Sequence, residues 1–150
     1  MSAPVPPADL RHAEDETAVA ACFAVMQALR PHLRSAEELV ARVARQRLEG
    51  YRLLAAWRAD TVIGLAGYRV QENLIHGRFV YVDDLVTAEA SRRHGLGARL
   101  LGAVGMEGRA LGCRRLVLDT ALDNVLGHRF YYRQGMLARA LRFSREIDSQ

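Results

Sequence analysis

The stretch Arg92-Arg93-His94-Gly95-Leu96-Gly97 carries the clearest structural signal in this chain. An apolar run over residues 79–86 precedes it and a helix-forming segment over residues 98–111 follows it, so the order predicts a strand, a glycine turn and a helix start. The first N–H groups of a helix have no partner within the helix, and the helix dipole makes that end positive. With arginines alongside, the stretch predicts a phosphate site. The alternative is a plain helix cap with solvated arginines.

Three kinds of phosphate-binding loop contain closely spaced glycines, and the neighbouring residues distinguish them. A nucleoside-triphosphate loop needs Gly-Lys-Ser/Thr, whereas this chain continues Gly97-Ala98-Arg99. A dinucleotide loop needs a third glycine where Leu100 stands, and it should follow the first strand of its fold. The third pattern, Arg/Gln-x-x-Gly-x-Gly/Ala, is matched without a gap by Arg92, Gly95 and Gly97.

A second motif follows downstream. Residues 124–136 read Asn-Val-Leu-Gly-His-Arg-Phe-Tyr-Tyr-Arg-Gln-Gly-Met. Together with the loop, this segment resembles the GNAT superfamily of acetyl-CoA-dependent N-acetyltransferases, whose downstream motif is Asn-x-x-Ala-x-x-Phe-Tyr-x-x-x-Gly-Phe. Gly127 and Met136 replace the family's Ala and Phe, and both positions stay small or apolar. The two motifs and a strand predicted between them at residues 114–121 cover roughly residues 79–147.

The resemblance implies a GNAT-like α/β fold. This fold is a mixed, mostly antiparallel central sheet flanked by helices, and its strands are splayed where acetyl-CoA binds. The pantetheine arm of acetyl-CoA is expected along residues 85–87 and its pyrophosphate at the loop. From its position alone, Asn124 could equally be the cap of the last helix. The cofactor-binding residues implied are Leu85, Val86, Thr87, Arg92, Arg93, His94, Gly95, Leu96, Gly97, Ala98 and Asn124.

Acetyl transfer to an amine needs the amine in its neutral form, and an acidic pair could supply the base. At pH 7 a free alkylamine is mostly protonated, a penalty of about 4.6 kcal/mol, and a carboxylate can bind the cation and relay its proton. Asp83 and Asp84 lie in an otherwise apolar strand. They alternate to opposite faces unless a bulge intervenes, so one is expected to contact the acceptor, with Asp83 preferred as the base. The alternative is that either residue pairs with an arginine or caps a loop.

Two tyrosines are candidates for the acid that protonates the departing thiolate. Tyr131 aligns with the family tyrosine that stands near the thioester sulfur, and Tyr132 follows it. Packing or substrate contact suits Tyr132 better, and helix packing is the alternative for both. The resemblance also implies that a backbone N–H at residues 85–86 polarises the thioester carbonyl.

Composition limits the remaining possibilities. At 150 residues, with 50% hydrophobic and 25% charged residues, the chain is predicted to form a single domain over residues 1–150. The longest apolar stretch, residues 18–26, is too short to span a membrane, and the start lacks the pattern of a signal peptide, so a cytoplasmic protein without a membrane partner is expected. Cys22 and Cys113 are isolated and the histidines are scattered, so no metal site is predicted.

The net charge of +4 raises the question of nucleic-acid binding. The arginines of the chain are spread along the predicted helices. The sequence has no aromatic platform for stacking bases and no zinc-finger spacing, so no nucleic-acid partner is expected. A positive rim would equally attract the phosphates of coenzyme A.

Local patterns place the elements around these motifs. Gly102, Gly105 and Gly108 form a smooth stripe that is interpreted as close packing of a helix on the sheet. The predicted strands are residues 10–13, 51–57, 62–70, 79–86, 114–121 and 138–147, and the predicted helices are residues 15–29, 35–50 and 98–111 and one that begins at residue 123 or 124.

The sequence therefore predicts an N-acetyltransferase that moves an acetyl group directly from acetyl-CoA to a primary amine. The position of the acidic pair resembles the polyamine and small-amine branch of the superfamily, which favours a small or polyamine-like acceptor. The substrate contacts expected are Asp83 and Asp84, and a homodimer is implied by the resemblance alone. The alternative is a function of a different class, a non-catalytic acyl-CoA-binding regulatory module.

Overall fold

The computed structural model describes residues 3–148. The chain forms two compact units, of which the first ends at Leu118 and the second begins at Asp119. The expectation of a single domain stays a prediction.

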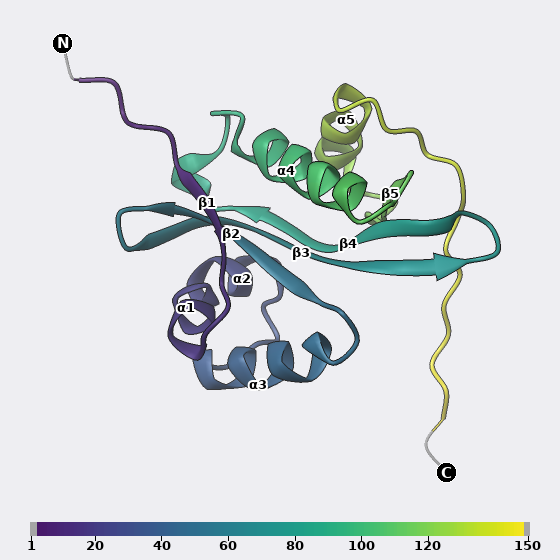
Figure 1. Cartoon of the computed structure of the whole chain (residues 1–150), viewed down its shortest axis with the longest axis horizontal. Coiled ribbons are helices and arrows are strands. Elements are labelled where there is room, and N and C mark those ends of the chain that lie inside the picture. Colours follow the sequence, from purple (N-terminus) through teal and green to yellow (C-terminus); the bar gives the residue numbers. More distant parts are fainter. Residues whose placement is uncertain (1–2, 149–150) are drawn as a thin grey trace. The chain divides into compact units, whose positions relative to one another are not determined.

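The first unit is built on a five-stranded sheet with the order β1-β2-β3-β4-β5 (Figure 1). Neighbouring strands are antiparallel except for β4 and β5, which are parallel. The mixed, mostly antiparallel sheet expected from the motifs is therefore confirmed. The strands are β1 (Asp9–His12), β2 (Arg52–Arg58), β3 (Thr61–Asn73), β4 (Gly77–Thr87) and β5 (Leu116–Leu118).

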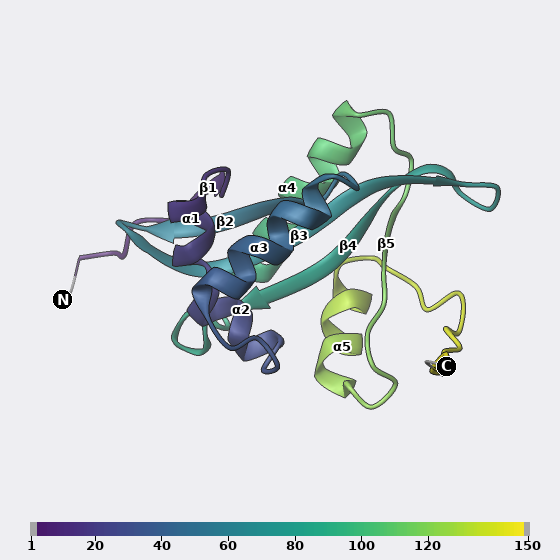
Figure 2. The same ribbon diagram turned by 90° about the horizontal axis from the view of Figure 1, so that it is seen from below.

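Helices cover both faces of this sheet. Helices α1 (Glu16–Ala21), α2 (Phe23–Leu29) and α3 (Ala36–Arg47) lie on one face, and α4 (Leu96–Ala110) lies on the other (Figures 1 and 2). A short 3₁₀ helix, η1 (Glu89–Ser91), joins β4 to the loop before α4. The loop is thus held between a central strand and a helix that packs on it.

Side-chain caps explain where the first helices begin. The Asp15 carboxylate accepts a hydrogen bond from Ala18 N (2.7 Å) at the start of α1. The Ser35 hydroxyl accepts one from Glu38 N (3.1 Å) at the start of α3. Each cap satisfies an N–H group that the helix leaves without a partner.

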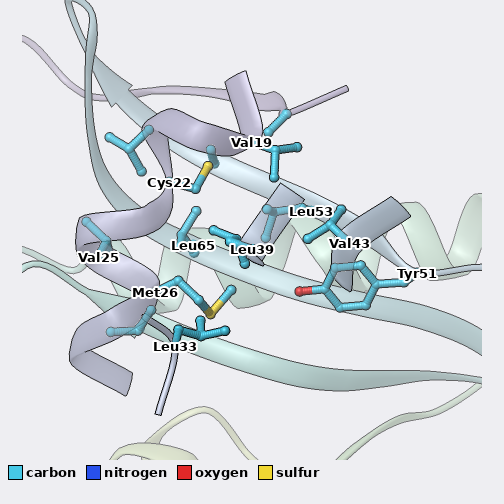
Figure 3. Close-up of a cluster of buried hydrophobic side chains, with 14 of the residues drawn as sticks. Val19, Cys22, Val25, Met26, Leu33, Leu39, Val43, Tyr51, Leu53 and Leu65 are labelled. Carbon is cyan, nitrogen blue, oxygen red and sulfur yellow. The ribbon is translucent and has the colours of Figure 1, made fainter. Parts of the chain in front are cut away.

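The core of the first unit lies between the sheet and α1–α3 (Figure 3). Val19 and Leu39 of the helices pack there with Leu53 and Leu65 of the strands, and all four are at most 4% exposed. On the other face, Leu100 of α4 comes so close to the sheet that a Cβ on Gly64 would lie 3.1 Å from its Cδ1 atom. Both faces are therefore covered with apolar side chains, which fixes the position of β4.

Two expected elements differ in detail from the structure. The helix predicted over residues 15–29 is divided into α1 and α2 at Cys22, and the strand predicted over residues 114–121 is reduced to β5. The interpretation of the glycine stripe holds only at Gly108, where a Cβ would lie 3.0 Å from Val80 Cγ1. A Cβ on Gly102 would meet nothing within 4 Å, so close packing is wrong there.

The second unit contains one helix, α5 (Val125–Arg133), and an irregular segment that follows it (Figure 1). The strand predicted over residues 138–147 is wrong, because residues 137–148 form neither a helix nor a strand. Alternating side chains give a segment the pattern of a strand, but a strand also needs a neighbour to bond its backbone. No strand among residues 3–148 pairs with this segment.

Candidate active site

The loop before α4 has the geometry of an anion site. Gly95, the residue before the helix, has φ 74° and ψ 10°, a left-handed conformation that glycine adopts without strain. Arg93 also has a positive φ of 69°. Arg92, Arg93 and His94 are all exposed, so the turn presents cationic side chains around the helix start.

The start of α4 has no side-chain cap. Glycine has no side chain to accept a hydrogen bond, and the first N–H that bonds back into the helix belongs to Arg99, which donates to Gly95 O (3.1 Å). The N–H groups of Leu96, Gly97 and Ala98 therefore point out of the helix end with no carbonyl of the helix to accept them. This is the arrangement that binds phosphate groups.

A bulge in β4 brings the two aspartates to the same face of the sheet. The register between β3 and β4 shifts by one residue, because Gly67 lies opposite Asp84 and Tyr68 lies opposite Val82. Asp83 is the extra residue, so the strict alternation of a strand is broken there. Both carboxylates contact side chains on the α1–α3 face. In a regular strand, successive side chains alternate between the two faces, so the sequence predicted only one of the two aspartates on that face.

Asp84 is fully occupied by neighbours within the chain. Its Oδ1 atom accepts a hydrogen bond from Arg30 Nε (2.9 Å), and its Oδ2 atom accepts one from the Tyr51 hydroxyl (2.8 Å). A Cβ on Gly67 would lie 2.0 Å from that hydroxyl oxygen, so only glycine leaves room for this bond. The Asp84 side chain is 13% exposed. These contacts make Asp84 a residue that positions its neighbours.

Asp83 is held on one side only. Its Oδ2 atom accepts a hydrogen bond from Arg69 Nε (3.1 Å), whereas Oδ1 has no hydrogen-bond partner among residues 3–148. Arg69 is in turn fixed by Gln46, to whose Oε1 atom its Nη2 donates (2.9 Å), and by Glu49. Burial raises the pKa of Asp83, and the bond and charge of Arg69 oppose that rise. Asp83 is therefore a more basic carboxylate than usual with one free oxygen.

β4 has an open edge directly after the bulge. β5 pairs with β4 from Val80 to Val82, so the part of β4 that follows Val82 has no strand partner on that side within the sheet of the first unit. This is the splayed region expected from the resemblance.

The ladder between β3 and β4 shows which N–H groups point toward the open edge. Ala88 N donates to Ile63 O (2.8 Å), which makes this a hydrogen-bonded pair. Since such pairs recur at every second residue, Val86 bonds to β3, and Leu85 and Thr87 direct their N–H groups away from it. Of the two residues expected to carry the oxyanion donor, Leu85 therefore directs its N–H away from β3, and Val86 does not.

In the second unit, Asn124 caps α5. Its Oδ1 atom accepts a hydrogen bond from Gly127 N (3.1 Å), and its Nδ2 atom donates to Thr120 Oγ1 (2.9 Å). A Cβ on residue 127 would lie 2.3 Å from Nδ2, so Gly127 leaves space for the cap. The capping alternative is thus observed, and the cofactor contact of Asn124 stays a prediction.

The two tyrosines of α5 differ in exposure. Tyr131 is half-buried, its ring lies edge-on to Phe130 at a centroid distance of 5.2 Å, and burial raises the pKa of its hydroxyl. Tyr132 is 57% exposed. A raised pKa makes the Tyr131 phenol a weaker acid, and an ordinary phenol is already protonated at neutral pH, so the roles of the two tyrosines stay predictions.

Comparison with known proteins decides the family. The sequence pattern of the Acetyltransferase (GNAT) family matches residues 15–136, which include the loop, the acidic pair and α5. The chain belongs to the GNAT family. The recognition made from the two motifs is therefore confirmed, and with it the family's use of acetyl-CoA as cosubstrate.

The GNAT chain also resembles individual proteins. It is 30% identical over 98 residues to an aminoalkylphosphonate N-acetyltransferase of Salmonella typhimurium, an alignment that covers 65% of this chain and 62% of the relative. Among solved structures, an acetyltransferase of Trypanosoma brucei superposes with a TM-score of 0.77 at 20% identity, over 93% of this chain and 99% of that one. The aminoglycoside N-acetyltransferase AAC(6′)-Iy in complex with CoA gives 0.81 at 19% identity, over 93% and 94%. These structural matches confirm the GNAT fold.

The arginines and the tyrosine around the acidic pair were not found from the GNAT motifs. Arg30 follows α2, Tyr51 precedes β2 and Arg69 lies on β3, far apart in sequence. For Arg69 the sequence did contain a hint, because a charged residue within the long apolar run of β3 needs a partner when it is buried. For Arg30 and Tyr51 the sequence contained no such hint.

The part of the GNAT chain that the structure describes contains neither a metal-ligand cluster nor a membrane-spanning helix. Among residues 3–148, no three His, Cys, Asp or Glu residues lie together as metal ligands would. No helix in the same range is long and apolar enough to cross a bilayer. The cytoplasmic location and the lack of a nucleic-acid partner stay predictions.

Proposed function

We propose that this protein transfers an acetyl group from acetyl-CoA to the primary amine of a small acceptor, directly and without an acyl-enzyme intermediate. The observation that carries the proposal is the order of three features along β4 and the loop that follows it. The bulged acidic pair comes first, then the outward N–H of Leu85, and then the loop before α4, which has no side-chain cap. These are the base, the oxyanion donor and the pyrophosphate site that the reaction requires.

The loop binds the pyrophosphate of acetyl-CoA in this proposal. The N–H groups of Leu96, Gly97 and Ala98 donate to phosphate oxygens, and the exposed Arg92 and Arg93 add positive charge. The Leu85 N–H donates to the thioester carbonyl, where negative charge develops as the amine attacks. AAC(6′)-Iy, which shares the fold, was solved in complex with CoA, which supports a coenzyme A site in a chain of this fold.

Asp83 acts as the base. Its free Oδ1 atom accepts a proton from the acceptor's ammonium group, either directly or through a water molecule, and so supplies the neutral amine. Burial supports this role, because a raised pKa makes the carboxylate a better proton acceptor.

Tyr131 acts as the acid. Its hydroxyl protonates the thiolate of coenzyme A as the carbon–sulfur bond breaks. The proton moves uphill by roughly 2 kcal/mol for ordinary phenol and thiol pKa values, which a positioned acid can support. Burial raises the pKa of the Tyr131 hydroxyl, which adds to this uphill cost, so the proposed role depends on the position of the hydroxyl beside the sulfur.

The acceptor is a small amine rather than a strongly cationic polyamine. Arg30 and Arg69 pair with the two aspartates, so the acidic pair carries little net negative charge to attract a polycation. The Arg30 side chain is 42% exposed and lies beside the pair, where it can bind an anionic group on the acceptor. The relative from Salmonella typhimurium is named for aminoalkylphosphonates, small amines that carry such a group. We propose the same class here, and a homodimer as the working form.

A thiol-release assay tests this proposal. Acetyl-CoA is offered with aminoalkylphosphonates, amino acids, polyamines and an aminoglycoside to the wild type and to Tyr131→Phe. Turnover of a small acidic amine that falls at least tenfold in Tyr131→Phe is expected. Binding of acetyl-CoA without turnover of any amine would favour the regulatory module instead, and no binding would overturn the assignment of the loop.

A further inference from the structure

Asp83 keeps a raised pKa although two arginines contact it. Arg69 Nε donates to its Oδ2 atom (3.1 Å), and Arg30 Nη2 donates to its carbonyl oxygen (2.8 Å). An arginine beside an aspartate commonly lowers the pKa of that carboxyl by about one to three pH units. Burial raises the pKa of Asp83, and the hydrogen bond and charge of Arg69 oppose that rise without cancelling it. The basicity of Asp83 therefore depends on how strongly the Arg69 charge acts on it.

Arg69 is divided between two carboxylates. Besides the bond of its Nε atom to Asp83, its Nη1 atom donates to Glu49 Oε2 (3.3 Å), and its Nη2 atom donates to Gln46 Oε1 (2.9 Å). The Arg69 side chain is only 12% exposed, and its guanidinium carbon lies 5.4 Å from the centroid of the Tyr51 ring. Each nitrogen of the guanidinium group thus has a partner, and two negative charges share one positive charge.

The two carboxylates lie at different depths. The Glu49 side chain, in the turn after α3, is 78% exposed, whereas the Asp83 side chain on β4 is 23% exposed. Arg69 lies between them, where burial leaves its charge less screened by water than at the surface. Because Glu49 interacts with that charge from the solvent side, less of it stabilises the ionised form of Asp83. An exposed side chain thereby influences a partly buried one.

The other charged and titratable groups beside Asp83 oppose one another. Asp84, the next residue on β4, raises the pKa of Asp83, and Arg30, at the end of α2, lowers it. Asp84 and Arg30 form an ion pair with each other (2.9 Å). Tyr51, before β2, is neutral, because burial raises the pKa of its hydroxyl well above the usual value. Arg69 on β3 is the remaining charged contact of Asp83 within residues 3–148.

We propose that Glu49 is a positioning residue for acetyl transfer, which shares Arg69 with Asp83 and so keeps Asp83 able to accept a proton from the acceptor's ammonium group. The proposal rests on the proposed function, in which Asp83 is the base. The proton moves from the ammonium nitrogen to Asp83 Oδ1, and the electron pair left on the nitrogen attacks the thioester carbon. Glu49 acts through Arg69 and exchanges no proton in this step.

The pKa of the Asp83 carboxyl, followed by carbon NMR in the free protein, tests the sharing without any turnover. Glu49→Gln keeps an oxygen that accepts from Arg69 and removes the charge, so it should lower this pKa by about 0.5 pH unit. Glu37→Gln is the matched control and should leave the pKa in place, because Glu37 is an exposed glutamate of α3 that does not contact Arg69. An unchanged pKa in Glu49→Gln, or an equal change in Glu37→Gln, would overturn the proposal.

A double-substitution cycle tests whether Arg69 transmits the effect. In the Arg69→Gln background, Glu49→Gln should leave the pKa of Asp83 almost unchanged, because the shared charge is absent. An equal change of this pKa in both backgrounds would overturn transmission through Arg69.

The pH profile of kcat/KM connects the sharing to the reaction. In Glu49→Gln, the acidic limb should move to lower pH by the same amount as the pKa of Asp83, while circular dichroism stays that of the wild type. A limb that stays in place while the NMR pKa moves would overturn the assignment of Asp83 as the base, and with it the role of Glu49 in the reaction. The NMR result alone decides whether Arg69 is shared, so the two failures are distinguishable.

Discussion

Two helices of this GNAT chain begin in opposite ways. α5 begins at Asn124, whose side chain accepts a hydrogen bond from Gly127 N (3.1 Å). α4 begins at Gly95, which has no side chain with which to do so. The difference teaches that the chain itself satisfies one helix start, whereas the other start is left without a side-chain cap.

The acidic pair shows the same contrast within two residues. Both oxygens of Asp84 accept hydrogen bonds from Arg30 and Tyr51, whereas one oxygen of Asp83 is free. A polar group whose hydrogen bonds are all made within the chain has a structural role. A neighbouring group with an unused acceptor atom can bind a substrate.

The largest effect is expected at Asp83. Asp83→Asn should lower kcat by about 1,000-fold, because the proton acceptor is lost. Its unfolding free energy should change less than that of Asp84→Asn, since the amide oxygen can still accept from Arg69 and Arg69 keeps Glu49 as a charged partner. Asp84→Asn should instead lower the unfolding free energy by about 1–3 kcal/mol, because Arg30 loses its charged partner. Steady-state kinetics and urea unfolding of both variants provide the comparison, and equal losses of kcat without a change in stability would contradict it.

The next effect concerns the open helix start. Gly95→Asp places a negative charge where the pyrophosphate binds and should weaken coenzyme A binding by about 100-fold in calorimetry. Gly95→Asn has the same size without the charge and should lose less affinity. Gly50→Asp is the control away from the site, because Gly50 also has a positive φ of 87° and open space around it. Equal losses in Gly95→Asp and Gly95→Asn would show that strain, and not charge, is responsible.

A smaller effect is expected in the pH profile. Arg69 lowers the pKa of Asp83 through its hydrogen bond and its charge. Arg69→Gln should therefore raise that pKa further, so the acidic limb of kcat/KM moves to higher pH. The wild-type limb should itself lie above the ordinary pKa of an aspartate, because burial raises it. A limb that stays in place in Arg69→Gln would indicate that a different group is the base.

The smallest effect is expected at the capped helix start. Asn124→Ala should lower the unfolding free energy by about 1 kcal/mol through the lost cap. Asn124→Asp keeps an acceptor for Gly127 N and should be close to the wild type. The KM for acetyl-CoA should stay within twofold in both variants if capping is the whole role of Asn124. A larger rise in KM would establish the cofactor contact that the family resemblance implies.

The sequence predicted the parts of the fold that depend on local signals. The turn around Gly95, a helix that begins near residue 35 and the two strands over residues 51–57 and 62–70 are all present. The bulge at Asp83 could not be located, because it arises from the register between two strands. The partners Arg30, Tyr51 and Arg69 come together only when the chain folds. The prediction of a strand over residues 138–147 was wrong for a related reason. Alternation of apolar and polar side chains does not specify a neighbouring strand with which to pair.

The most direct test of the contrast between the two helix starts is amide NMR during titration with coenzyme A. The account predicts that the largest backbone amide shifts occur at Leu96, Gly97 and Ala98, and that the Gly127 amide, which donates to Asn124, moves much less. Small shifts at residues 96–98 in a sample that binds coenzyme A would contradict the account.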